Sequence, residues 1–229
     1  MVGFDLDMTL ADTRAGIGAC YARIAAETGV FIDVDLVTSR LGPPLEMEMA
    51  NWFPADRVDA VVERYRELYP DIAVPASKAM PGAREAVEAV RVAGGRTMVV
   101  SAKNHRDTVA TVEFLELPVD VIQGGLWAAA KGSALREHAA TVYVGDHPGD
   151  VDAARAADAF SLAVATGGFS ADTLRDYGAD EVLSDLACFP TWLRDNPIQP
   201  PSSPSIDATA TASSAKTTTS TTSPRDSDR

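Results

Sequence analysis

The sequence predicts an α/β protein with a doubly wound parallel sheet and an inserted all-α domain. From about residue 96 onward, short apolar runs alternate with stretches of helical spacing, an order that favours parallel strands joined by helices. Between residues 13 and 79, the apolar positions recur at helical spacing instead. Polar residues directly follow several of the expected strands, which is where ligands of doubly wound folds bind.

The elements of the core can be assigned in order along the chain. Residues 2–6 form a short apolar run and should be the first strand. Pro81 favours a helix start and Gly94 favours a helix end, so a helix is expected between them. Further strands are expected over residues 96–101, 119–123, 141–145, 160–165 and 181–183. The helices that separate them should cover residues 105–115, 131–138, 150–157 and 171–177.

The insert should consist of helices that each bury one apolar face. One such face comprises Ile17, Cys20, Tyr21, Ile24, Ala25 and Thr28, and another comprises Val58, Val61, Val62, Tyr65 and Tyr69. Residues 41–45, with the sequence Leu-Gly-Pro-Pro-Leu, interrupt the helices and should form a loop. That loop either turns the chain between two helices or faces a substrate.

These patterns divide the chain into three parts. Residues 1–12 and 80–197 form the expected catalytic core, and residues 13–79 form the helical insert. Residues 198–229 are rich in Ser, Thr and Pro and contain almost no apolar bulk. We expect this tail to be disordered, because it has no apolar surface whose burial could offset the entropy of ordering.

Composition excludes several classes of partner. With 229 residues, of which 46% are apolar, the chain can bury a sizeable core. Its formal charge of -13 repels nucleic acid and anionic membranes, so neither is an expected partner. It has no signal-peptide pattern and no run of about 18 apolar residues, and we expect a cytoplasmic monomer or homodimer. Cys20 and Cys188 lie in apolar helical patterns and should be buried free thiols.

Four polar motifs occur in a fixed order along the core. They are Asp5, Asp7 and Thr9 after the first strand; Ser101 at the end of a strand; Lys131 at the start of a helix; and Asp146 after Gly145, followed by Asp150. Each motif alone has an ordinary explanation as a turn, a helix cap or a solvated charge. Because the carboxyl ends of parallel strands meet at one edge of the sheet, a single pocket can collect all four.

This set and order of motifs resembles the haloacid dehalogenase-like superfamily of Mg²⁺-dependent phosphatases, over about residues 1 to 195. The resemblance implies a Rossmann-like core and identifies the insert as a helical cap, which in this superfamily closes over the active site and carries substrate specificity. One residue departs from the pattern, because Met8 stands where members very often have Gly. If that position adopts a positive φ, a Met there would be strained.

The resemblance assigns catalytic roles to the two acids after the first strand. Asp5 would be the nucleophile that forms an aspartyl phosphate, and Asp7 would act as general acid and then as general base. Ser101 and Lys131 would bind the phosphoryl oxygens.

The same residues suggest a metal site. Asp5 and Asp146 offer the carboxylate oxygens that Mg²⁺ prefers, and the resemblance adds the main-chain carbonyl of Asp7. Asp150 would orient the metal's surroundings through water or Lys131, with direct ligation as the alternative. Thr9 would steady the loop or Asp7.

The remaining polar residues carry weaker signals. His105, His138 and His147 do not cluster at metal-ligand spacing, so we expect surface or capping roles. Arg14, Arg40, Lys103 and Asn104 could contact a substrate carboxylate or sugar, but ordinary surface placement is the leading expectation for each.

The leading functional hypothesis is a phosphatase of a small phosphorylated metabolite, either phosphoglycolate-like or a sugar phosphate. A phosphomutase of the β-phosphoglucomutase type would share every motif residue and stays open as an alternative. A catalytically silent scaffold or regulator is the alternative from another class, although burying these charges without a metal and ligand would cost stability. A haloacid dehalogenase is disfavoured because Asp7, Asp146 and Asp150 would then be unexplained.

Overall fold

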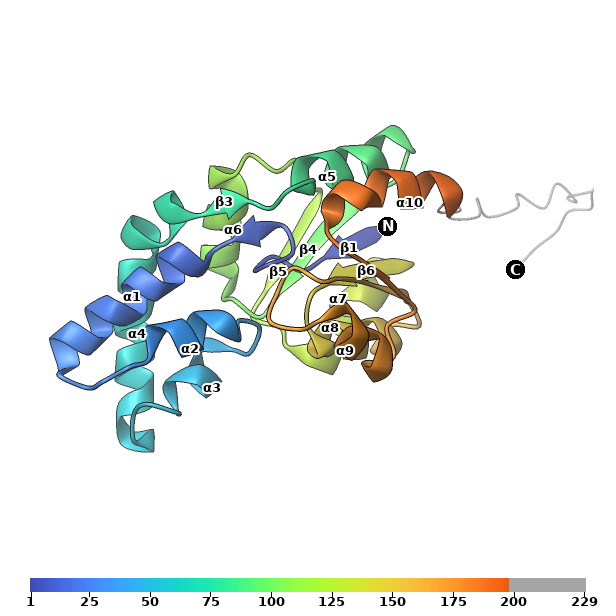
Figure 1. The fold of residues 1–229 in the computed structure, drawn as a ribbon. Helices are drawn as coiled ribbons and strands as arrows, with labels where there is room; N and C mark the ends of the chain where they lie inside the picture. Colours follow the sequence, from blue (N-terminus) through green and yellow to red (C-terminus); the bar gives the residue numbers. More distant parts are fainter. Residues whose placement is uncertain (198–229) are drawn as a thin grey trace, which may run out of the picture.

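A parallel sheet forms the centre of the computed structural model, which describes residues 1–197 (Figure 1). Within these residues the sheet has six strands in the order β5-β4-β1-β6-β7-β8, and every neighbouring pair is parallel. The strands are β1 (Val2–Phe4), β4 (Thr97–Ser101), β5 (Val121–Gly124), β6 (Val142–Gly145), β7 (Phe160–Val164) and β8 (Glu181–Leu183). The predicted fold class is confirmed, and the predicted tail of residues 198–229 lies outside the described part.

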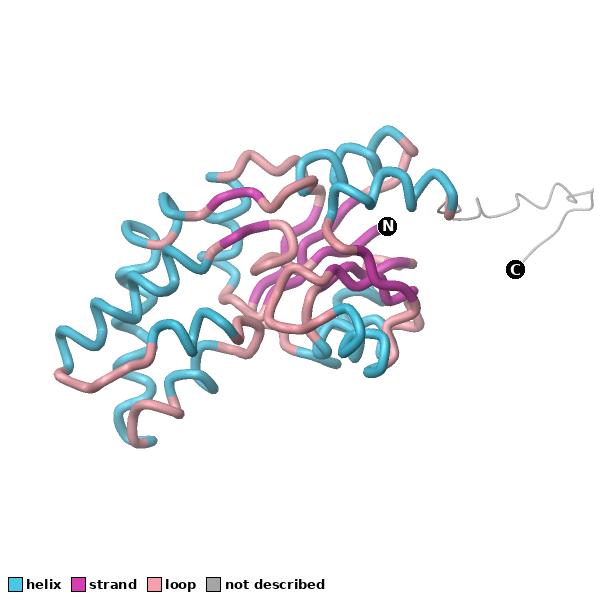
Figure 2. Tube along the Cα trace, in the orientation of Figure 1, coloured by secondary structure: helices cyan, strands magenta, loops and turns pink. Residues whose placement is uncertain are grey.

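Helices cover both faces of this sheet, as Figure 2 shows around the magenta strands. The helices of the core are α5 (Ala83–Val92), α6 (His105–Phe114), α7 (Lys131–Glu137), α8 (Pro148–Ala156), α9 (Ala171–Tyr177) and α10 (Phe189–Asp195). In β4, Val99 packs with Phe189 of α10 on one face, while Met98 and Val100 pack with Leu135 of α7 on the other. This alternation along one strand builds two hydrophobic layers, as a doubly wound sheet requires.

Local hydrogen bonds explain two of the element boundaries that differ from the prediction. Strand β1 ends at Phe4 rather than at residue 6, since the carbonyl of Leu6 accepts hydrogen bonds from the amides of Leu10 and Ala11 and closes a turn. Helix α8 begins at Pro148, because the His147 side chain accepts a hydrogen bond from the amide of Gly149 and caps the helix. The expected capping role of a histidine is therefore met at His147.

The insert forms a helical layer beside the sheet, at one end of the molecule in Figure 1. It contains α1 (Arg14–Thr28), α2 (Val34–Ser39), α3 (Leu45–Met49), α4 (Ala55–Ile72) and the 3-10 turn η1 (Val74–Ala76). Its apolar faces meet in a separate hydrophobic cluster, in which Tyr21 of α1 packs on Tyr65 of α4 with ring centroids 5.2 Å apart. The predicted apolar faces of α1 and α4 are the ones that pack together.

A short antiparallel ribbon joins the insert to the core. Strand β2 (Ala11–Asp12) pairs with β3 (Lys78–Ala79), with Ala11 opposite Ala79. This ribbon was not predicted, since strands of two residues carry no periodic pattern. It holds together the two points where the chain enters and leaves the helical layer.

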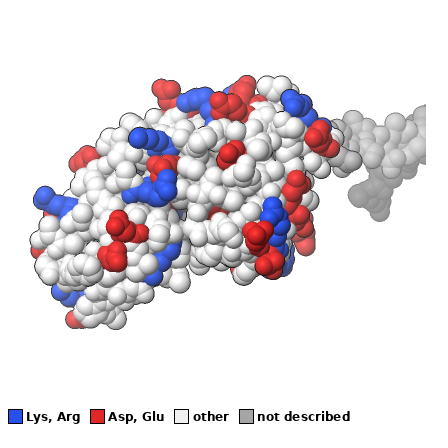
Figure 3. Space-filling view, in the orientation of Figure 1, with Lys and Arg blue, Asp and Glu red and all other residues white. Residues whose placement is uncertain are grey.

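Surface features complete the description of residues 1–197. Cys20 is buried in the insert as expected, but the prediction was wrong for Cys188, which is exposed at the end of the 3-10 turn η3 (Leu186–Cys188). On the face drawn in Figure 3, acidic and basic side chains are interspersed over the surface. Within the described residues, every helix is too short or too polar to span a lipid bilayer.

Candidate active site

The sequence motifs meet at the carboxyl ends of the three central strands. β1 lies between β4 and β6, so the residues that follow these strands are neighbours. Asp5 directly follows β1, Ser101 is the last residue of β4, and Asp146 directly follows β6. All three side chains are buried.

Lys131, the first residue of α7, places its ammonium group inside this cluster. Its Nζ lies 2.7 Å from Asp5 Oδ1, 2.8 Å from Asp150 Oδ1 and 3.0 Å from the hydroxyl of Tyr143. The residue is only 1% exposed, and a buried ammonium group is stable only when it is paired. Burial lowers the pKa of Lys131, but the charges of Asp150 and Asp5 outweigh it and hold that pKa well above its usual value. Lys131 is therefore a fixed positive charge.

Three carboxylates crowd around that single cation. Oxygen atoms of Asp5, Asp146 and Asp150 all lie within 4.8 Å of one another. Burial raises the pKa of Asp5 to about 7 and raises that of Asp146 well above its usual range, with the neighbouring carboxylates adding to both shifts. Lys131 balances only one of the three charges. The remaining negative charge and the all-oxygen donor set fit a divalent metal ion.

The surroundings of Asp146 fix the position of its carboxylate. Thr9 Oγ1 donates a hydrogen bond of 2.7 Å to Asp146 Oδ1. On the other side, a Cβ atom on Gly167 would lie 1.8 Å from Asp146 Oδ2, so any other residue there would force that carboxylate to move. Thr9 thus steadies Asp146 and its loop rather than Asp7.

Asp7 is not part of this group of three carboxylates and has partners of its own. Its Oδ1 accepts hydrogen bonds from the hydroxyl of Thr13 and from Nζ of Lys103. The expected surface placement of Lys103 was wrong, because its side chain is only 8% exposed and pairs with Asp7. Sequence analysis also missed Thr13, which stands directly before α1 and has the residue type of a helix cap.

The turn that carries Asp7 also contains Met8, the residue that departs from the family pattern. Met8 has a φ of 63°, so the positive φ at this position is confirmed for a non-glycine residue. The Met8 amide donates to the carbonyl of Ala11 over 2.7 Å, and the Thr166 hydroxyl donates to the carbonyl of Met8 over 2.6 Å. These bonds hold the strained backbone in place.

The other polar residues that the sequence singled out lie in different surroundings. Ser101 Oγ accepts a 3.2 Å hydrogen bond from the amide of Lys103, and Asn104 caps α6 by accepting from the amide of Asp107. Arg14 pairs with Asp12 at the surface, as expected. Arg40 is not an ordinary surface residue, because it forms a two-point ion pair with Glu48 at the edge of a cavity.

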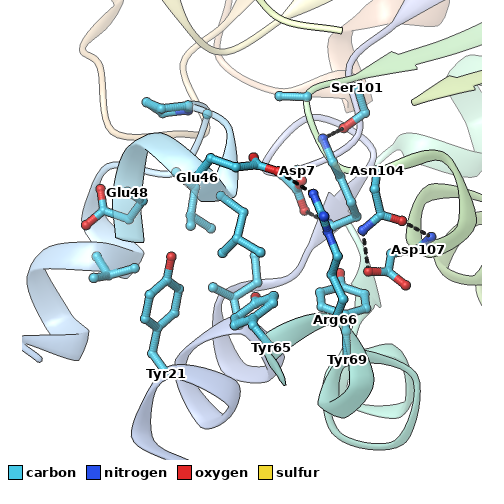
Figure 4. Close-up of a pocket in the computed structure, with 18 of the residues that line it drawn as sticks. Asp7, Tyr21, Glu46, Glu48, Tyr65, Arg66, Tyr69, Ser101, Asn104 and Asp107 are labelled. Atoms are coloured by element: carbon cyan, nitrogen blue, oxygen red, sulfur yellow. Dashed lines mark hydrogen bonds and ion pairs between the residues drawn. The ribbon is translucent and has the colours of Figure 1, made fainter. Parts of the chain in front are cut away.

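A cavity of about 80 Å³ opens between the acids of the core and the helical insert (Figure 4). Asp5, Asp7 and Ser101 line it from the core, and Tyr21 and Arg66 are among the residues that line it from the insert. Leu41, Gly42, Pro43 and Leu45 also line it, so the loop predicted at residues 41–45 faces this cavity.

Comparisons with known proteins agree with this architecture. The family model described as "Haloacid dehalogenase-like hydrolase" matches residues 2–164. A comparison with curated proteins gave no significant match.

Solved structures share the fold over nearly their whole length. A predicted phosphatase from Clostridium acetobutylicum is 21% identical, with a TM-score of 0.74, covering 85% of this chain and 97% of that chain. A predicted phosphoglycolate phosphatase from Haemophilus somnus is 17% identical, with a TM-score of 0.70, covering 84% and 96%. A candidate beta-phosphoglucomutase from Thermotoga maritima is 22% identical, with a TM-score of 0.65, covering 85% and 98%. The family match spans most of the chain, and the protein belongs to the haloacid dehalogenase-like hydrolases.

Proposed function

We propose that this protein is a Mg²⁺-dependent phosphatase that hydrolyses a small phosphorylated metabolite through an aspartyl phosphate on Asp5. The observation that carries this proposal is the buried cluster of Asp5, Asp146, Asp150 and Lys131, whose excess negative charge needs a cation. A scaffold without catalytic function would gain nothing from keeping such a cluster buried.

The metal would be held by the carboxylates of Asp5 and Asp146 and by the main-chain carbonyl of Asp7. When bound there, Mg²⁺ supplies positive charge that offsets the repulsion between a carboxylate nucleophile and a phosphate dianion. Asp150 supports this arrangement through its 2.8 Å bond to Lys131, and its place in the carboxylate cluster also allows direct ligation.

The first chemical step would be performed by Asp5 and Asp7. An oxygen of Asp5 attacks phosphorus, the bond from phosphorus to the leaving oxygen breaks, and Asp7 gives its proton to that oxygen. Lys131 and the hydroxyl of Ser101 stabilise the phosphoryl oxygens during the attack. In the second step, Asp7 takes a proton from water, which attacks phosphorus and releases phosphate and free Asp5.

The test compares the wild-type protein with Asp5→Asn, using p-nitrophenyl phosphate with Mg²⁺ or with a chelator. We expect Mg²⁺-dependent release of nitrophenol and a loss of at least about 1,000-fold in kcat for the variant, because the amide cannot serve as the nucleophile. Asp152→Asn is the matched control, since Asp152 lies on α8 and pairs with Arg155 at the surface. Activity that survives Asp5→Asn, or that does not need a metal, would refute the mechanism.

A phosphomutase would use the same residues, and the fold shared with the Thermotoga maritima protein keeps this alternative open. Product analysis separates the two activities. A phosphatase releases inorganic phosphate in proportion to substrate consumed, whereas a mutase returns an isomeric phosphate ester.

A further inference from the structure

We propose that the leaving group of the substrate is a short, uncharged polyol rather than a carboxylate. This inference rests on the proposed phosphatase activity and names the class of phosphate ester that the cavity selects. It is argued from the charges that line the cavity, from its hydrogen-bond acceptors and from its size.

Every cationic side chain that lines the cavity is already paired with a carboxylate. Arg40 bonds Glu48 through Nη2 and Nε, at 2.7 and 3.1 Å. Arg66 bonds Glu46 within the cavity wall, as Figure 4 shows, and also bonds Glu63 at 2.8 Å. Lys103 is the third cation, and it pairs with Asp7.

Carboxylates outnumber these cations in the lining of the cavity. The acids are Asp5, Asp7, Glu46, Glu48 and Asp107, against Arg40, Arg66 and Lys103. A carboxylate on the leaving group would enter a site with no free cation and with several like charges nearby. Like charges brought together in a desolvated site repel one another strongly. The lining therefore disfavours an anionic leaving group.

The wall contributed by the insert offers hydrogen-bond acceptors. Glu46 and Glu48 both line the cavity. The O–H groups of a polyol can donate to carboxylate oxygens without bringing charge, whereas a carboxylate on the leaving group has no hydrogen to donate.

The cavity also limits the length of the leaving group. A volume of about 80 Å³ holds roughly five to eight groups the size of a water molecule. Because the cavity reaches Asp5 and Ser101, the phosphoryl group takes part of this space. The space left favours a short leaving group, and one of about three carbons would extend to the opening of the cavity. Glycerol 3-phosphate is therefore a suitable probe, and 3-phosphoglycerate is its match in size with a carboxylate in place of a hydroxymethyl group.

The experiment measures kcat/KM for these two esters, with p-nitrophenyl phosphate as a general reference substrate. We expect glycerol 3-phosphate to be preferred at least about tenfold, because the carboxylate of its counterpart meets cations that are already paired and a lining in which acids outnumber cations. Equal or faster hydrolysis of 3-phosphoglycerate overturns the inference, as does hydrolysis of neither ester while the reference substrate is consumed. If the reference substrate is also inert with Mg²⁺, the proposed function itself fails.

A variant tests whether the ion pairs set this preference. Glu46→Gln removes the cavity partner of Arg66 and leaves only Glu63, which is 69% exposed and holds Arg66 weakly. We expect the preference for glycerol 3-phosphate over 3-phosphoglycerate to fall at least about threefold. Glu67→Gln is the control, because it removes the carboxylate of an exposed pair with Arg64 on the same helix and should leave the preference unchanged. An unchanged preference in Glu46→Gln would contradict the role of this pair.

Discussion

Met8 combines two energetic effects of opposite sign at the residue scale. Its positive φ costs an L-residue about 1–2 kcal/mol, while its side chain, only 3% exposed, contributes packing energy in the core. Losing a buried Met side chain typically costs about 2–5 kcal/mol, so packing outweighs the strain. This balance explains how a Met can occupy a position that glycine fits better.

The balance predicts an unusual order of stability for substitutions at this position. Met8→Ala loses the packing and keeps the strain, so its free energy of unfolding should fall by about 2–4 kcal/mol. Met8→Gly loses the same packing but relieves the strain, and we expect it to be about 1 kcal/mol more stable than Met8→Ala. Urea denaturation of the three proteins measures both differences. An alanine variant more stable than the glycine variant would show that the backbone is unstrained.

The site residues that are easiest to place from the sequence are those that stand at the ends of strands, because the sheet fixes their positions. Asp5, Ser101 and Asp146 stand at strand ends, and parallel strands bring such ends together whatever the rest of the chain does. The contacts of Asp7 with Thr13 and Lys103 could not be predicted in this way. They depend on how the start of α1 and the loop after β4 approach the turn, which no periodic pattern encodes.

At the scale of elements, the packing of α1 on the end of the insert depends on one glycine. A Cβ atom on Gly16 would lie 2.5 Å from both Cα and the carbonyl oxygen of Ala73, and backbone atoms cannot move aside easily. A Cβ on Gly18, in the same helix, would meet side-chain atoms instead, Cγ1 of Val34 at 3.1 Å and Cγ2 of Thr38 at 3.4 Å. The two glycines therefore have different roles despite equal burial.

Substituting each glycine by alanine tests this difference. Gly16→Ala should lower the free energy of unfolding by about 2–3 kcal/mol, since the added methyl group forces the helix away from Ala73. Gly18→Ala should change it by less than about 1 kcal/mol, because the better helix propensity of alanine offsets a mild contact. Thermal or urea unfolding gives both values. Equal effects of the two substitutions would mean that α1 can shift freely.

The elements predicted best were those with strong periodicity. The strands from β4 to β8 lie within about two residues of their expected ranges, and helices α1 and α4 pack through their expected faces. The predicted ends of elements were wrong where a side chain or a turn sets the end. One example is Pro148, where a capping side chain precedes the helix. The ribbon of β2 and β3 was missed because it is defined by a pairing between residues far apart in sequence.

For the whole molecule, the buried carboxylates link stability to pH and to metal. Burial makes the pKa of Asp5 and Asp146 higher in the folded chain than in the unfolded chain. A carboxyl group whose pKa is raised by folding stabilises the folded chain at pH values below its pKa in the unfolded chain. This contribution is lost as the pH rises through its pKa in the folded chain. For Asp5 the window runs from its ordinary value of 3.8 to about 7. A bound divalent ion would offset the loss.

We therefore expect Mg²⁺ at about 100 times its Kd to raise the Tm at pH 8 by roughly 5–10 °C. Asp146→Asn should show no such rise, because it lacks one ligand. In a chelator at pH 8 the variant should be at least as stable as the wild-type protein, since it no longer holds an uncompensated carboxylate there. Differential scanning calorimetry of both proteins, with Asp152→Asn as control, measures these shifts. A Tm that does not respond to Mg²⁺ would contradict the metal site.

The pose of the insert is the part of the molecule that sequence patterns leave undetermined. Periodicity identified helices and their buried faces, but the lining of the cavity depends on how those faces of α1 and α4, and the loop at residues 41–45, are placed against the core. The ion pairs of Arg40 and Arg66 became visible only from coordinates. For this reason the grouping of the core acids with Lys131 was predictable, whereas the lining of the cavity was not.

The paired strands β2 and β3 also limit how the helical layer can travel. Because the two connections to the sheet are paired with each other, we expect the layer to move by pivoting about this ribbon rather than by sliding. The carbonyl of Ala11, in β2, accepts a hydrogen bond from the amide of Met8, which is the residue directly after Asp7. Any pivot would therefore pull on the turn that carries Asp7, so we expect movement of the layer to change the position of that carboxyl group.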